Sequence, residues 1–263
     1  MTSLPYFAGM NSIVLITGAT SGIGLACARK FASSGHALII TGRRQDRLDA
    51  ISHELKSMFG IQVLPLCFDV RNKAEVDNLL GNLPDTWDRV DILINNAGLA
   101  LGRDPFDEAD MDDWDTMLDT NVHGLLYVSR AVIPGMIARK KGHIVNIGSV
   151  AGKQVYENGN VYCASKAAVD AISQSMRIDL LKHGIRVTAI HPGAVETEFS
   201  IVRFKGNEGK AKSAYTGFTP LQAEDVADSI HYCTSLPGHV CINDLVITCT
   251  QQADAIYFSK NPG

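Results

Sequence analysis

The feature that most constrains this chain is a regular alternation of short apolar segments with longer amphipathic ones. The segments 12–18, 36–42, 90–98 and 142–150 are short apolar runs rich in β-branched residues, and the sequence between them is amphipathic at helical spacing. Buried strands give the first pattern and surface helices give the second. Strands that alternate with helices form a parallel sheet covered by helices on both faces. The chain is therefore predicted to be an α/β protein with a doubly wound parallel sheet.

The alternation predicts about seven strands and one domain. A chain of 263 residues could hold one or two domains, but it contains no linker, repeat or low-complexity segment. We expect a tail at 1–11 and a single domain at 12–263. The proline in the third strand predicts an irregular strand there. The expected strands are 12–18, 36–42, 61–70, 90–98, 142–150, 185–193 and 244–249. The first expected helix ends near 34, and the others span 45–58, 72–80, 114–138 and 162–181.

One segment, 199–219, interrupts the alternation. It is rich in glycine and lysine, and it follows directly on the carboxyl end of a predicted strand. Ligands bind at that end of the strands in open parallel sheets. We therefore predict that this lid segment (199–219) covers a binding site, with a plain surface insertion as the alternative.

The composition excludes several classes of partner. The net charge is −4, so nothing in it favours nucleic acid or an anionic membrane, and no apolar run is long enough to span a bilayer. The six cysteines form no C-x-x-C pair, which favours reduced thiols in a cytoplasmic protein. The eight histidines are scattered without ligand spacing, so we predict no metal site. A small molecule is the expected partner.

The turn after the first strand carries a glycine pattern, TGATSGIG, with glycines at 18, 22 and 24. Glycine lets the backbone approach a pyrophosphate closely, and the helix that follows aims its first N–H groups at the anion. The spacing differs from the common G-x-G-x-x-G fingerprint, but the physical requirement is the same. A tight turn without a ligand is the alternative. The position after the first strand favours a dinucleotide site.

The end of the second strand indicates which dinucleotide binds. NAD sites place an acidic residue there, for the ribose 2′-hydroxyl. This chain has Arg43 and Arg44 instead, and a guanidinium pairs well with a 2′-phosphate. Asp46 follows, and it fits a helix N-terminus equally well. The arginines favour NADP, with two solvated arginines as the alternative.

Tyr162 and Lys166 stand four residues apart in a predicted helix and so share one face. A tyrosine has a pKa of about 10, and a nearby ammonium favours its phenolate. Ser149 follows the fifth strand, where its hydroxyl can stabilise a developing alkoxide or simply cap a turn. Together the three residues favour proton transfer to and from an alcohol oxygen.

These motifs resemble those of the short-chain dehydrogenase/reductase family over about 12–248. TGxxxGxG, the NNAG of 95–98, Asn121, Ser149, Tyr162 with Lys166, and the Pro-Gly of 192–193 occur in the family's order. The resemblance implies a Rossmann-type fold and Asn121, Ser149, Tyr162 and Lys166 as catalytic residues, with Asn121 holding a water that leads to Lys166. It also implies a homotetramer or homodimer. The implied NADP contacts are Gly18, Thr20, Ser21, Gly22, Ile23, Gly24, Arg43, Arg44, Asp69, Val70, Asn96, Ala97, Gly98, Tyr162, Lys166, Pro192, Gly193, Val195 and Thr197.

Within the family, TGRRQDRL, TEFSIVRFKG and SLPGHVCIN resemble the NADP-dependent 3-hydroxy acid dehydrogenases, a subgroup that includes serine and allo-threonine dehydrogenases. Such a substrate carries a carboxylate. Arg203 or Lys205 in the lid segment could bind it, or both could be solvated. Tyr156 could line the pocket beside Ser149 and Tyr162, or only pack. A reductase of another carbonyl substrate and a non-enzymatic NADP-binding module remain as alternatives.

Overall fold

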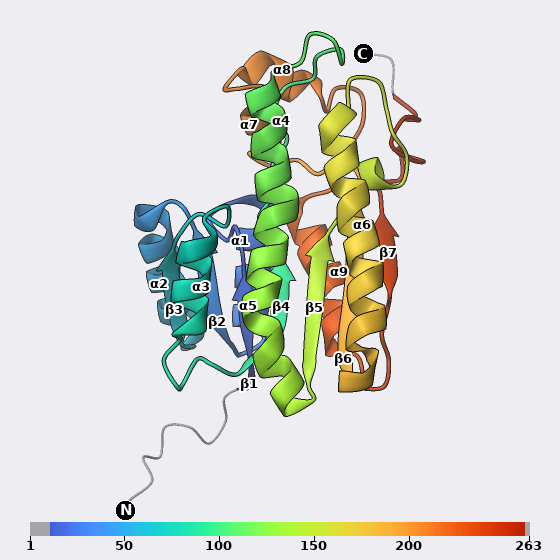
Figure 1. Ribbon diagram of the computed structural model, residues 1–263. Helices are drawn as coiled ribbons and strands as arrows, with labels where there is room; N and C mark the ends of the chain where they lie inside the picture. Colours follow the sequence, from blue (N-terminus) through green and yellow to red (C-terminus); the bar gives the residue numbers. More distant parts are fainter. Residues whose placement is uncertain (1–10, 261–263) are drawn as a thin grey trace, which may run out of the picture.

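The described part of the chain, residues 11–260 of a computed structural model, builds one parallel sheet of order β3-β2-β1-β4-β5-β6-β7 (Figure 1). This confirms the predicted doubly wound α/β class. The N-terminal tail at 1–11 lies outside the described residues, except that β1 already includes Asn11. The strands are β1 (Asn11–Ile16), β2 (His36–Gly42), β3 (Val63–Cys67), β4 (Val90–Asn95), β5 (Gly142–Ile147), β6 (Ile185–Pro192) and β7 (Asp244–Ile247).

Helices cover both faces of the sheet. In Figure 1, α3, α5 and α6 lie in front of it, and α1, α2 and α9 lie behind it. Helices α7 and α8 stand above the carboxyl ends of the strands. The helices are α1 (Gly22–Ser33), α2 (Gln45–Phe59), α3 (Lys73–Gly81), α4 (Met111–Leu118), α5 (Gly124–Arg139), α6 (Asn160–Leu180), α7 (Phe199–Arg203), α8 (Glu208–Ser213) and α9 (Ala223–Ser235).

The continuous apolar run of β1 is explained by burial on both sides. Val14 and Ile16 belong to the core cluster that contains Phe31 of α1, whereas Leu15 belongs to the opposite cluster with Met136 of α5. Successive side chains of a strand point to opposite faces, so a strand covered on both faces needs apolar residues at every position. All of these side chains are fully buried.

The third strand is regular, and the predicted irregularity is wrong. β3 pairs with β2 in an unbroken register from Leu38↔Val63 to Gly42↔Cys67, with Pro65 opposite Ile40. The physical reason is its place at the edge of the sheet, where a residue without a backbone N–H is tolerated.

The predicted single helix at 114–138 is divided. α4 ends at Leu118, a π-helical turn covers Asp119–His123, and α5 then begins. The turn places the buried side chain of Asn121 against a neighbouring loop, where it bonds to the backbone of Leu99. Single π-turns within helices often occur at functional sites.

The strand order reverses between β1 and β4, because β1 leads outward to β2 and β3, whereas β4 leads to β5, β6 and β7. A crevice opens at such a point, at the carboxyl ends of the strands. The glycine turn after β1 and the NNAG segment after β4 both end there, so the topology brings two distant motifs together.

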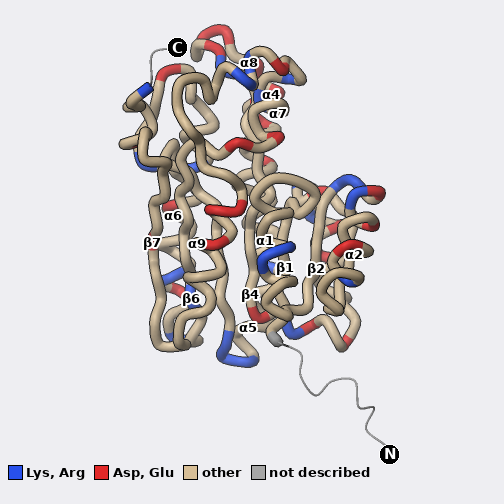
Figure 2. The backbone as a smooth tube through the Cα atoms, turned by 180° about the vertical axis from the view of Figure 1, so that it is seen from behind, with Lys and Arg blue, Asp and Glu red and all other residues tan. Residues whose placement is uncertain are grey.

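Basic and acidic residues are interspersed along the chain, and they lie next to one another around α2 and α8 in Figure 2. No helix within residues 11–260 is long and apolar enough to cross a membrane.

Candidate active site

A cavity of about 920 Å³ opens at the reversal of the strand order. It is lined by the turn after β1, the ends of β2 to β6, and the lid segment. Most of the predicted site residues line it, and Gly24, Asn121 and Lys205 do not. The predicted residues on its wall are Gly18, Thr20, Ser21, Gly22, Ile23, Arg43, Arg44, Asp69, Val70, Asn96, Ala97, Gly98, Ser149, Tyr156, Tyr162, Lys166, Pro192, Gly193, Val195, Thr197 and Arg203.

The glycine turn is held tightly against the NNAG segment. Gly18 has φ +67°, and the side-chain amide of Asn96 donates to its carbonyl at 3.2 Å. A Cβ on Gly24 would lie 2.3 Å from the Gly18 oxygen and 2.5 Å from the Asn96 amide nitrogen. Only glycine fits at 24 without moving the backbone, so this residue shapes the turn from beneath the cavity wall.

Arg44 is joined to the glycine turn. Its guanidinium donates to the Thr20 hydroxyl at 2.7 Å and to the Ser21 hydroxyl at 3.1 Å. It also pairs with Glu198, whose carboxylate accepts from Arg47 at 2.9 Å. The two guanidiniums therefore already hold an anionic group beside the turn. Arg43 also lines the cavity, and Asp46 lies in the first turn of α2, as its position predicts.

The three predicted proton-transfer residues meet on one wall. Tyr162 and Lys166 lie on α6, both are buried, and Ser149 follows β5 close enough for its hydroxyl to bond to that of Tyr162. The Lys166 Nζ donates to the Ile147 carbonyl at 2.8 Å. Burial lowers the pKa of Lys166 to about 8.

The expected effect of Lys166 on Tyr162 is not what the structure shows. Burial raises the pKa of Tyr162 above its ordinary value, with a smaller contribution in the same direction from Tyr156. The groups that oppose this rise are the Ser149 hydroxyl and the Arg203 guanidinium. The physical reason is that the Lys166 ammonium is itself desolvated and turned toward the Ile147 carbonyl.

Asn121 lies behind the cavity rather than on its wall. Its amide oxygen accepts from Leu99 N at 2.8 Å, and its nitrogen donates to Leu99 O at 2.8 Å and to the Ser165 hydroxyl at 3.0 Å. A Cβ on Gly98 would be 3.2 Å from the Asn121 oxygen and 3.5 Å from Lys166 Nζ. Asn121 thus adjoins Lys166 across Gly98, and its role toward a water stays a prediction.

Of the two cations proposed in the lid segment, only Arg203 reaches the cavity. Its guanidinium donates to the Tyr156 hydroxyl at 2.9 Å and lies 5.5 Å from the centre of the Tyr162 ring. The Lys205 Nζ instead pairs with Asp113 at 2.9 Å, and its side chain is 56% exposed. Arg203 therefore places a positive charge within reach of a group bound beside Tyr162.

Comparison with known proteins agrees with this arrangement. The family model of the short chain dehydrogenases matches residues 12–208. The chain belongs to the short-chain dehydrogenase family. It is 49% identical over 244 residues to the NADP-dependent 3-hydroxy acid dehydrogenase YdfG of Escherichia coli strain K12, over 92% of this chain and 97% of that protein.

Two other family members are similarly close. Sulfoacetaldehyde reductase 2 of Chromohalobacter salexigens is 47% identical over 245 residues, which cover 93% of this chain and 96% of that one. The closed form of serine dehydrogenase complexed with NADP+ superimposes with a TM-score of 0.88 at 47% identity, over 95% of this chain and all of that one (100%). The fold of a relative that binds NADP+ therefore matches nearly the whole of this chain.

Sequence reasoning missed several residues of the site. Arg103 follows the NNAG segment and lines the cavity, and its guanidinium carbon lies 5.6 Å from the centre of the Tyr156 ring. Glu198, just before the lid segment, and Phe199, its first residue, also line the cavity, and these two lie where the sequence already predicted the pocket. The C-terminal segment adds Gln252, Ala255, Ile256, Phe258 and Lys260. No spacing rule identifies these residues, because tertiary folding alone brings them to the cavity.

Proposed function

We propose that this short-chain dehydrogenase is an NADP-dependent oxidoreductase that acts on the hydroxyl-bearing carbon of a small 3-hydroxy acid. The observation that carries the proposal is the position of Arg203 beside Tyr162, on the cavity wall that Ser149 also lines. One end of the pocket can then bind a carboxylate while the other end transfers a proton. Relatives named for 3-hydroxy acid and serine dehydrogenation are 49% and 47% identical to this chain, which supports the same substrate class.

The residues present fit NADP. The glycine turn leaves the start of α1 open toward the cavity, where the first N–H groups of a helix need partners from outside it. Arg44, with Thr20 and Ser21, offers donors for a 2′-phosphate. The Arg44 guanidinium already donates to the Glu198 carboxylate, so its position suits an anionic group. Asn96, Thr197 and Lys166 would hold the remainder of the dinucleotide.

The bound cofactor supplies the acceptor or donor of a hydride. In oxidation, Tyr162 takes the proton of the substrate hydroxyl, and in reduction it returns that proton. The Ser149 hydroxyl donates to the substrate oxygen and stabilises the charge that develops on it. Arg203 supports this step as well, because its charge lowers the pKa of Tyr162 against the effect of burial.

The acid group of the substrate is assigned to Arg203. Its guanidinium is half-buried and donates from Nη1 to Tyr156 and from Nε to Gly102 O, which leaves further N–H groups for a carboxylate. Tyr156 is predicted to line the pocket, and it does so while holding the guanidinium in place. A sulfonate, the acid group of the substrate named for one relative, would suit the same guanidinium.

The lid segment is proposed to close over this pocket. It already contacts the far side of the cavity, because Arg203 O accepts from Gly102 N at 3.0 Å. Its base is tied down by the Tyr215 hydroxyl, which bonds to Ser200 at 2.6 Å and donates to Val195 O at 2.8 Å. These contacts hold the short helices α7 and α8 in position above the carboxyl ends of the strands.

A substrate panel tests the proposal. The protein is assayed for nicotinamide reduction with L-serine, L-allo-threonine, 3-hydroxypropionate and a bulky alcohol, with NADP and NAD in parallel, and for reduction of sulfoacetaldehyde. We expect NADP-dependent turnover of the small hydroxy acids and little turnover of the bulky alcohol. Preference for the bulky alcohol would favour a reductase of another carbonyl substrate, and no turnover at all would favour a binding module.

We also propose a homo-oligomer, a homotetramer or homodimer, in the cytoplasm. The exposed apolar residues Ile178 and Leu181 at the end of α6, each 74% exposed, support burial against a second copy. All six cysteines are free, as suits a reducing compartment.

A further inference from the structure

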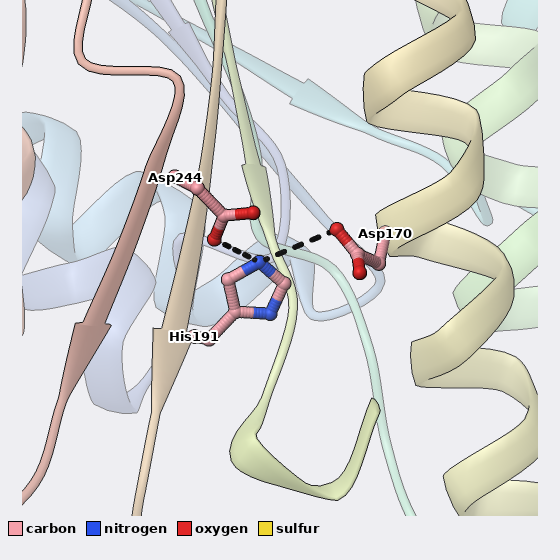
Figure 3. A group of neighbouring side chains, drawn as sticks. All are labelled: Asp170, His191 and Asp244. Carbon is pink, nitrogen blue, oxygen red and sulfur yellow. Dashed lines mark ion pairs between the residues drawn. The ribbon is translucent and has the colours of Figure 1, made fainter. Parts of the chain in front are cut away.

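Three potential metal ligands converge below Ser149, outside the cavity described above. Asp170 comes from α6, His191 from β6 and Asp244 from β7, and Figure 3 shows all three side chains directed at one point. The His191 Nε2 lies 2.9 Å from a carboxylate oxygen of Asp244 and 3.8 Å from one of Asp170. All three donor atoms fall within 4.8 Å of one another.

The contact made by Nδ1 of His191 bears on whether Nε2 can offer a lone pair. Nδ1 lies 3.4 Å from the carbonyl oxygen of Ser149. A carbonyl only accepts, so Nδ1 can keep the ring proton when Nε2 gives its lone pair to a metal ion. Gly148 fixes the ring in this place, since a Cβ there would lie 2.4 Å from Nδ1.

His191 Nε2 faces two carboxylates and makes no hydrogen bond of good geometry to either, although Asp244 Oδ1 lies 2.9 Å away. His191 is fully buried (0% exposed), and neither its Nε2 nor the buried Oδ1 of Asp170 has a hydrogen-bond partner within residues 11–260. Three electron-pair donors that face one another repel unless a cation lies between them.

The neighbouring charges leave room for that ion. The Lys153 ammonium lies 2.9 Å from the Oδ2 atoms of both Asp170 and Asp244, the oxygens that face away from His191. The Oδ1 atoms remain for another cation. The Asp244 carboxylate is 36% exposed, so an ion can enter from solvent.

We propose that Asp170, His191 and Asp244 bind a divalent transition metal ion, with Zn²⁺ as the preferred ion and water in the remaining position. Zinc takes imidazole nitrogen and carboxylate oxygen at about 2.0–2.2 Å in tetrahedral geometry, which small rotations of these side chains provide. The bond from Nδ1 to a backbone carbonyl is the usual outer support of a metal-bound histidine. The ion would join α6, β6 and β7 beside Ser149 and stabilise the folded chain.

The sequence prediction of no metal site considered the spacing of cysteines and histidines and left aspartates out. The three ligands are distant in sequence, and two of them are aspartates, so no ligand spacing exists to be seen.

The test is a titration of the metal-free full-length protein with Zn²⁺ by calorimetry. We expect one ion per chain. Asp244→Asn should weaken binding by more than about 100-fold, since even outer-shell changes cost about 10- to 100-fold. Lys153→Gln removes a competing charge and should strengthen binding by about tenfold or more. Asp77→Asn is the matched control, because Asp77 pairs with a lysine on the distant helix α3, and it should change nothing.

A cobalt spectrum distinguishes this site from a cysteine site. Co²⁺ bound by nitrogen and oxygen gives visible bands without a thiolate charge-transfer band, which is the expected result. The proposal is overturned if neither the natural protein nor Lys153→Gln binds one ion. It is equally overturned if Asp244→Asn binds as tightly as Asp77→Asn, or if the bound Co²⁺ shows a thiolate band.

Discussion

The substitution Arg203→Met tests how the pocket recognises an acid. The guanidinium donates to Tyr156 at 2.9 Å and lies 5.5 Å from the Tyr162 ring centre, so its removal affects a bound carboxylate and the proton-transfer residue together. A hydrogen bond to a charged group contributes about 1.5–3 kcal/mol, and about 1.4 kcal/mol corresponds to a factor of ten. We therefore expect kcat/KM for 3-hydroxypropionate to fall by about 10- to 150-fold.

The methyl ester of 3-hydroxypropionate separates the two effects. Both substrates lose any benefit that Arg203 gives to Tyr162, but only the acid loses a partner for its charge. The ester should therefore be affected much less than the acid. Since Arg203 lowers the pKa of Tyr162, the variant should also need a higher pH to reach its maximal oxidation rate with either substrate.

Lys205→Met is the control for this experiment, because Lys205 pairs with Asp113 at 2.9 Å and does not line the cavity. It should leave both substrates unchanged. Equal losses on the acid and the ester in Arg203→Met would refute the assignment of the carboxylate to Arg203. A loss with Lys205→Met that matches that of Arg203→Met would refute it as well.

Three further predictions concern the cofactor site and the core. Gly24→Ala should weaken NADPH binding, measured by fluorescence, by about 5- to 150-fold, because overpacking costs about 1–3 kcal/mol; Gly81→Ala meets nothing within 4 Å and should leave binding unchanged. Arg44→Ala should lower kcat/KM with NADP by about 10- to 100-fold and with NAD much less. Burial lowers the pKa of His143 to about 3, so the fold should lose stability as pH falls from about 6.5 to 3, by roughly 4–5 kcal/mol. His143→Gln should flatten that part of the denaturation profile, and an unchanged slope would show that His143 is not the cause.

The fold was predictable because its signals are local and repeated. The apolar runs of β1 and β2 and the glycine turn between β1 and α1 each follow from a few neighbouring residues, and the structure has these elements where the sequence predicts them. The π-helical turn at Asn121 was not predictable in this way. Its cause is a side-chain bond to Leu99, a contact that exists only in the folded chain.

The candidate site was predictable where residues stand at fixed spacing on one element. Tyr162 and Lys166 share α6 and reach the same wall. Electrostatics were predicted less well, because a pKa depends on burial as much as on neighbouring charge, and burial raises the pKa of Tyr162. Arg203 and Lys205 show the same limit, since a single residue separates them and yet only Arg203 lines the cavity.

The most direct measurement compares the natural protein with Tyr162→Phe in NADP-dependent oxidation of a small 3-hydroxy acid. The phenylalanine keeps the ring that packs 5.7 Å from that of Phe199 and removes only the hydroxyl. General acid–base catalysis contributes about 10²–10⁴-fold, so turnover should fall by at least about 100-fold while NADPH binding, followed by fluorescence, stays near its original strength. A variant that retains more than about a tenth of the original rate would contradict the role of Tyr162 in proton transfer.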